Sequence, residues 1–287
     1  YDEKAIKLKF KKDSEVKNIT FTKNYLYKLI FKSLNSYNEE KSIDSKLTNI
    51  LNRCRILLYK ALIRQYFKTL KMGKELAVKN ERFSYLLEFL EIERQLTKKE
   101  ELSKNDISKV YIEENDTLDK IRNINEYKRA VNILFKIFRT DGIVRTKNED
   151  EKINQILASV NYPDENKAMS VIAKETYYFA LSIANEFKGD FEKAYFYFKK
   201  RFQIIDSNTG VFQNSLFNNY KDSFLMMISA ASDSGKFTEA EKLYKKFIQS
   251  FKTSEDQDLD VSFTRFGILL NYALHTGNKN DFSKHAA

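Results

Sequence analysis

Three glycines divide the last part of the chain at nearly regular intervals, and residues of the same type stand at equivalent positions before each of them. Gly189, Gly235 and Gly277 are 46 and 42 residues apart, and each ends an apolar run. Aromatic residues stand eleven places before them and large apolar residues eight places before: Tyr178, Phe224 and Phe266, then Leu181, Met227 and Leu269. Glycine just past a helix supplies the left-handed residue that ends it. The register therefore predicts three helices that end at equivalent positions.

The agreement continues after the first two glycines. Aromatic, alanine and aromatic residues follow at two, five and nine places: Phe191, Ala194 and Phe198, then Phe237, Ala240 and Tyr244. A small residue between two aromatic ones lets a second helix pack closely against the first. The chain has one proline and seven glycines, which favours long helices over sheets. The predicted fold is therefore all-α, built from antiparallel helical hairpins.

The two turns resemble those of a known family. Gly-Asp-Phe-Glu-Lys-Ala at 189–194 and Gly-Lys-Phe-Thr-Glu-Ala at 235–240 are similar to the turn and second helix of tetratricopeptide repeats. The spacing is longer than the family's usual repeat of about 34 residues. Arg201 and Phe247 stand where the family has its second small residue. Longer helices and a shifted packing contact are expected from these departures.

The resemblance implies a stacked α-solenoid whose first helices line a concave face that binds protein or peptide. The face is expected to carry eight residues of the three first helices: Phe179, Ile183, Glu186, Leu225, Ser229, Ser232, Gly267 and Asn271. The alternative is that a further helix covers Phe179, Ile183 and Leu225. The sequence alone leaves both open.

Three regions are expected along the chain. Residues 1–140 carry apolar residues at helical spacing without a clear copy of the repeat, although Ala61-Leu62-Ile63 can be read as a degenerate turn with Tyr66 in place of alanine. Residues 141–162 are polar and predict a loop or linker. Pro163 is expected to open the helix that leads into the repeats of 163–287.

The residues that usually perform chemistry are scarce, so no catalytic, cofactor-binding or metal site is predicted and we do not expect an enzyme. The single cysteine, Cys54, lies between Arg53 and Arg55 but falls on an apolar helical stripe, which favours a core position. His275 and His285 are the only histidines. No glycine-rich phosphate loop or nucleophile motif is present.

The formal net charge of +10 makes nucleic acid the rival partner. Basic clusters occur at 9–12, 199–201 and 242–246, but acidic residues are interleaved throughout and lysine prevails over arginine, the residue suited to bidentate phosphate contacts. We therefore expect a protein-interaction or peptide-interaction scaffold. A nucleic-acid-binding helical protein and the peptide-sensing domain of a larger regulator are the alternatives.

The cellular compartment is expected to be the cytoplasm. No apolar run approaches the roughly 18 residues of a membrane span, and a single cysteine suits a reducing environment. A leader removed before Tyr1 stays an alternative because the chain does not begin with Met. Whether residues 285–287 belong to the natural protein is also left open.

Overall fold

The structure is a computed structural model, which describes residues 9, 19–39, 42–97, 104–142, 146–159, 165–212, 216–251 and 259–276. The regular elements in these ranges are helices, and no strand occurs among them. The α-helices are α3 (Ile19–Glu39), α4 (Ile43–Tyr59), α5 (Ile63–Lys79), α6 (Phe83–Thr97), α7 (Lys104–Asp141), α8 (Lys147–Ser159), α9 (Val171–Phe187), α10 (Phe191–Ser207), α11 (Thr209–Phe212), α12 (Leu216–Asp233), α13 (Phe237–Phe251) and α14 (Leu259–Thr276). The predicted all-α class is confirmed.

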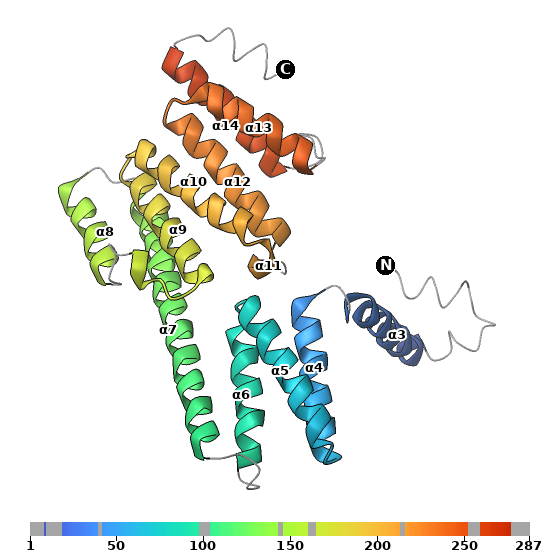
Figure 1. Ribbon diagram of the computed structural model, residues 1–287. Coiled ribbons are helices and arrows are strands. Elements are labelled where there is room, and N and C mark those ends of the chain that lie inside the picture. Colours follow the sequence, from blue (N-terminus) through green and yellow to red (C-terminus); the bar gives the residue numbers. More distant parts are fainter. Residues whose placement is uncertain are drawn as a thin grey trace.

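The helices lie in two groups that the long helix α7 connects (Figure 1). Helices α4, α5 and α6 pack together, and α6 packs against α7. The other end of α7 packs against α9, and the series continues through α10, α12, α13 and α14. With 38 residues, α7 is about 57 Å long, which is enough to reach both groups. This packing of neighbouring helices is compatible with a helical-repeat fold.

Four turns between consecutive helices share one hydrogen-bond pattern. Each centres on a residue with positive φ: Ala61, Glu81, Gly189 and Gly235. In each turn the next backbone N–H donates to the carbonyl five residues earlier, at 2.8 to 2.9 Å, and the new helix begins two residues after the central one. This is the Schellman arrangement, which satisfies carbonyls left over at a helix end. The turn predicted at Ala61 is therefore present, and Glu81 adds a copy that the sequence did not reveal.

The residues after these turns are buried in register. The fifth and ninth residues after each centre lie in the core: Tyr66, Leu86, Ala194 and Ala240, then Leu70, Leu90, Phe198 and Tyr244. Helix α5 lies between two such turns, so it closes one hairpin and opens the next. The helix ends predicted before Gly189 and Gly235 are confirmed, whereas the turn predicted at Gly277 lies outside the described residues.

The structure differs from the predicted loop at 141–162, because residues 147–159 form α8. Its start is a capping box: Thr146 N–H donates to Glu149 Oε2 at 2.9 Å, and Glu149 N–H donates to Thr146 Oγ1 at 3.3 Å. Ile153 of α8 is fully buried in the same apolar cluster as Leu134 and Tyr177, which lie on either side of the segment. The chain's division into domains stays a prediction.

The helix that leads into the repeats begins later than expected. Pro163 was predicted as its start, but α9 begins at Val171 after a short 3-10 turn over Glu165–Lys167. Ser170 caps it, since its side chain accepts a hydrogen bond from the backbone N–H of Ala173 at 3.0 Å. The polar cap, and not the proline, marks the helix start.

The turn between α5 and α6 joins the two groups of helices. Glu81 accepts hydrogen bonds from the backbone N–H groups of Val171 and Ile172, at 2.7 and 2.8 Å, and so caps α9 from outside. Arg82 donates to the carbonyl oxygen of Val211 and to Asp44 Oδ1, both at 2.9 Å. Charged contacts between segments 90 to 129 residues apart thus fix the N-terminal helices against α9 and α11.

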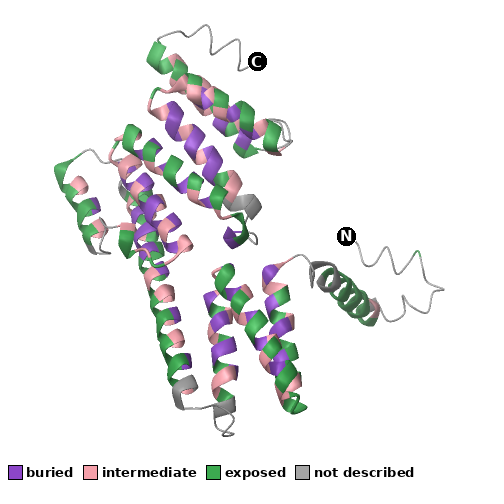
Figure 2. Cartoon of the chain, in the orientation of Figure 1, coloured by how far each residue is buried: buried purple, intermediate pink, exposed green. Residues whose placement is uncertain are grey.

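Burial follows the inner faces of the helices from α4 onward, whereas the described side chains of α3 are exposed, apart from half-buried Thr22 (Figure 2). Tyr25, Leu26 and Ile30 are between 50 and 56% exposed. A helix that presents apolar residues on every side is usually buried in an assembly.

Adding one methyl group to two helical glycines is expected to have opposite effects. At Gly73 in α5, a Cβ would overlap the buried ring of Phe89 and lie 2.9 Å from Ile50 Cγ2. At Gly267 in α14, a Cβ would meet nothing within 4 Å. We expect Gly73→Ala to lower the free energy of unfolding by about 1–3 kcal/mol through overpacking. Gly267→Ala should raise it by about 0.5–1 kcal/mol through helix propensity.

Urea denaturation of both variants measures this difference. The two substitutions are chemically identical, so helix propensity cancels between them. Equal changes in the denaturation midpoint would contradict the close approach of α5 to α4 and α6.

Candidate functional site

An open groove of about 450 Å³ lies where the C-terminal end of α7 meets α9, α10, α12 and α14. Its lining residues are Phe135, Phe138, Ile183, Glu186, Phe187, Phe198, Asp222, Leu225, Met226, Ser229, Asp260, Phe263 and Thr264. The set contains three carboxylates and no lysine or arginine. In a chain of net charge +10, this is a locally acidic and apolar surface.

Four of the residues predicted for a binding face line this groove. Ile183 and Glu186 project from one face of α9, and Leu225 and Ser229 project from one face of α12. Residues three or four apart lie on the same side of a helix, which is why each pair faces one space. Ile183 and Leu225 are 2% and 7% exposed, so they form the floor of the groove.

The other predicted residues lie outside the lining. Phe179 packs under the guanidinium of Arg201, 3.8 Å from the ring centroid, and against Phe135 of α7 with ring centroids 6.0 Å apart. Helix α7 therefore packs on Phe179, as the alternative of a covering helix expected. Asn271 of α14 donates to Ser232 Oγ at 3.3 Å, so these two residues join α14 to α12.

Gly267 of α14 is half-buried and does not line the groove either. Like Asn271, it belongs to the helix that forms one wall. The predicted face is therefore divided between the groove itself and the contacts that assemble it.

The walls come from residues that sequence reasoning did not assign to the site. Phe138 of α7 stacks on Phe187 with centroids 4.3 Å apart and an angle of 7° between the rings, and 40% of Phe138 is exposed. Phe263 of α14 is 71% exposed. Phe138 belongs to residues 1–140, whose apolar residues recur at helical spacing, but nothing in the sequence indicated that this part of the chain meets α9 and α12. Two exposed aromatic rings thus flank an apolar floor.

Two carboxylates of the groove, Glu186 and Asp222, and the neighbouring Asp233 have raised pKa values. Burial, with a smaller contribution from the charge of Asp233, raises the pKa of Glu186 to about 7. Burial also raises the pKa of Asp233, although the hydrogen bond from Asn271 lowers it in part. Burial raises the pKa of Asp222 as well. A cation that entered the groove would favour the ionised forms of these groups, so it would bind there better than an anion.

A buried ion pair between α9 and α10 lies next to the groove. Arg201 Nε of α10 lies 2.6 Å from Glu175 Oε1 of α9, and both side chains are nearly inaccessible. Thr176 Oγ1 donates to the other Glu175 oxygen at 3.2 Å. Arg201 Nη1 lies 3.5 Å from Met226 Sδ, and Met226 lines the groove. The position where the resembled family has a small residue is thus occupied by a charge that ties α10 to α9.

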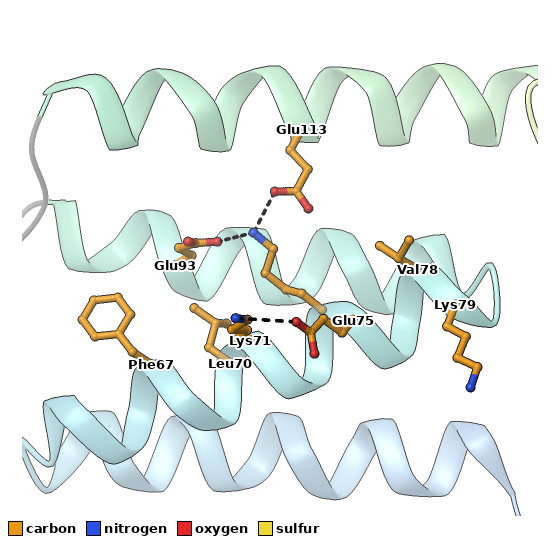
Figure 3. A pocket seen from close by; sticks show the side chains of 9 residues that line it. Phe67, Leu70, Lys71, Glu75, Val78, Lys79, Glu93 and Glu113 are labelled. Atoms are coloured by element: carbon orange, nitrogen blue, oxygen red, sulfur yellow. Dashed lines mark hydrogen bonds and ion pairs between the residues drawn. The ribbon is translucent and has the colours of Figure 1, made fainter.

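A second pocket, of about 640 Å³, lies between α5, α6 and α7. Lys74 reaches from α5 to Glu93 of α6 and Glu113 of α7, with 2.7 Å from its Nζ to each carboxylate (Figure 3). These carboxylates raise the pKa of Lys74, against the opposing effect of burial. Lys71 and Glu75 pair at its edge, 3.8 Å apart. Both carboxylates of α6 and α7 are engaged by Lys74, so this pocket joins three helices through its own ion pairs.

The basic cluster at 199–201 is not one surface. Arg201 turns into the core, while Lys199 and Lys200 are exposed, and Lys199 Nζ lies 3.5 Å from Glu239 Oε1. The second cluster, 242–246, has three exposed lysines on α13. The first, 9–12, lies almost entirely outside the described residues. One predicted cluster is therefore divided between the surface and the core.

The residues considered for chemistry occupy structural positions. Cys54 is fully buried, and burial raises the pKa of its thiol to about 11, so it is a core residue as predicted. The His275 ring packs against Phe237 with centroids 5.2 Å apart. Within the described ranges, no group of three or more His, Cys, Asp or Glu residues is placed to hold a metal ion. None of the described helices has the length and apolar character that crossing a membrane requires.

Comparisons with known proteins do not add to this picture. No protein-family model matches the chain, and the searches of curated proteins and of solved structures found no match to it. The groove between α7, α9, α10, α12 and α14 is therefore the feature from which a function is inferred.

Proposed function

We propose that the protein is a non-enzymatic interaction module, similar to tetratricopeptide-repeat solenoids, that binds a protein or peptide segment in the groove of α7, α9, α10, α12 and α14. The observation that carries the proposal is the composition of the groove. Exposed Phe138 and Phe263 flank a buried apolar floor at Ile183 and Leu225. Aromatic anchors around such a floor supply much of the energy at protein interfaces.

The placement of the groove supports the same proposal. The helices that resemble successive first helices of the repeat, α9, α12 and α14, each contribute to it. The resemblance implies that the binding face lies on these helices. Longer helices and the ion pair of Arg201 with Glu175 account for the departures from the usual repeat.

The charge of the groove favours a polypeptide over nucleic acid. Neutralising phosphates takes lysine or arginine, and the lining has three carboxylates and neither of these residues. Arg201 is committed to Glu175 inside the core. The exposed lysines of α13 would then bind nucleic acid weakly and with a steep dependence on salt.

A pull-down from the native host with two matched variants tests the proposal. Phe263→Ala removes an exposed ring of the groove, and Phe196→Ala removes a ring of α10 that is 53% exposed outside the lining. We expect the unchanged protein and Phe196→Ala to capture the same partner after nuclease treatment. Phe263→Ala should reduce that capture at least about tenfold, as loss of an interface anchor does.

Circular dichroism first verifies that both variants keep their helicity. Equal capture by both variants, or capture that disappears with nuclease, would contradict a protein-binding groove. Capture that disappears with nuclease would favour the nucleic-acid alternative.

A further inference from the structure

We propose that α3 of a second copy of the chain occupies the groove, so that two copies exchange their α3 helices. This inference rests on the proposed function, because it names the occupant of the same groove. It draws on two surfaces of one chain: a helix whose apolar side chains the described residues leave exposed, and a groove with exposed rings.

The first surface is α3, whose exposed apolar residues surround the helix. Phe21, Tyr25 and Leu29 follow one another at intervals of four, so they form a stripe along one face, and they are 71, 55 and 43% exposed. Leu26 and Ile30 are similarly exposed on another face. The helix has 21 residues and is therefore about 32 Å long. Apolar patches of this extent mark interaction surfaces.

The charges of α3 complement those of the groove. Lys28 and Lys32 fall at helical spacing beside Tyr25 and Leu29, so the stripe combines apolar and basic side chains. Glu39, at the end of the helix, is its only acidic residue. The groove provides acidic side chains, Glu186 and Asp222, among apolar ones, whereas its third carboxylate, Asp260, already pairs with Lys221 at 3.0 Å. A basic, apolar helix thus fits an acidic, apolar groove.

The position of α3 points to a second copy. Helix α3 lies beside α4, away from α7, α9, α12 and α14 of the same chain (Figure 1). Within the described residues, each chain thus has an exposed apolar helix and an accessible groove. If each copy places its α3 in the groove of the other, both exposed helices and both grooves are covered, and the result is a two-fold dimer.

Sedimentation of the full chain over a range of concentrations tests the proposal with two charge reversals. One variant carries Lys28→Glu with Lys32→Glu on α3, and the other carries Asp222→Lys in the groove. Each homodimer would contain two like-charge interfaces, so each reversal should raise the dimer dissociation constant at least about tenfold. The matched control, Lys242→Glu with Lys246→Glu, changes exposed lysines of α13 by the same charge and should leave dimerisation unchanged.

A mixture of the two reversed variants distinguishes the exchange from any other dimer. In the mixed dimer, the acidic α3 of the first variant meets the basic groove of the second. The other α3 and the other groove keep their natural charges. We expect the mixture to recover a heterodimer that neither variant forms alone.

A chain that stays monomeric at all concentrations would overturn the proposal, as would a dimer that both reversals leave intact or a mixture without recovery. Occupation of the groove by α3 of the same chain would appear as the first of these outcomes. The proposed function has a separate test, the capture of a partner. If the chain is monomeric but still captures a partner through Phe263, the helix exchange is refuted and the proposed function stands.

Discussion

Arg201→Met is expected to lower the free energy of unfolding by about 3–5 kcal/mol, because it leaves Glu175 buried without its partner. The Arg201 guanidinium lies 2.6 Å from Glu175 and 3.8 Å from the centre of the Phe179 ring. Methionine preserves much of the packing volume, so the loss reports mainly the unpaired charge. Urea denaturation near neutral pH, with the midpoint and slope fitted together, measures the change.

The double variant Arg201→Met with Glu175→Gln is the control. Removing both charges should recover most of the loss, since a neutral amide costs far less to bury than a carboxylate. A single variant within about 1 kcal/mol of the unchanged protein would contradict the buried pair.

Glu186→Gln is expected to stabilise the protein at pH 8 and to leave its stability unchanged near pH 4. The folded protein raises the pKa of Glu186 from 4.5 to about 7, so ionisation costs more in the folded state than in the unfolded one. Below pH 4.5 both states hold the proton and no penalty exists. Stability then decreases as the pH rises from about 4.5 to 7, by up to about 3 kcal/mol. Glutamine stays neutral and removes this penalty.

Denaturation of both proteins at pH 4, 6 and 8 measures whether the stability gained by Glu186→Gln increases with pH. The charge of Asp233 on α12 contributes to the raised pKa of Glu186, so part of the expected gain comes from removing the repulsion between these two carboxylates. A gain that is equal at pH 4 and pH 8 would show that the charge of Glu186 is not its origin.

The turns were the most predictable part of the fold, because each is a local event. Gly189 and Gly235 have φ values of 74° and 75°, which glycine adopts without strain. Ala194 and Ala240 are fully buried after them. The turn at Glu81 was not recognised as the same type of turn, because glutamate rarely takes positive φ. The carboxylate of Glu81 caps α9, a contact with a residue 90 positions away in sequence, and this contact offsets the cost of the positive φ.

Two helix starts have capping residues that are visible in the sequence, but other features of the sequence suggested different boundaries. Thr146 and Glu149 form a capping box, yet the charged composition of the segment favoured a loop. Ser170 caps α9, although Pro163 had suggested an earlier start. In both cases a polar side chain that satisfies backbone N–H groups determined the boundary, and average composition did not.

The groove was only partly predictable, because it depends on which helices meet. Ile183 and Leu225 were expected on a binding face because of the resemblance to tetratricopeptide repeats. Phe138 could not be expected there, since its role depends on the far end of a helix of 38 residues reaching α9. The partner of Arg201 lies 26 residues away on another helix, which no local pattern reveals.

Photo-crosslinking from the groove tests the central claim, that this surface binds a polypeptide. A photo-reactive amino acid replaces Ser229, which lines the groove, and in a control protein it replaces Ser250, an exposed serine of α13 outside the lining. Both proteins are illuminated in cells of the native host. We predict an adduct with another polypeptide, either a partner or a second copy, from position 229 and none from position 250. No adduct at position 229, or equal adducts at both positions, would contradict the account.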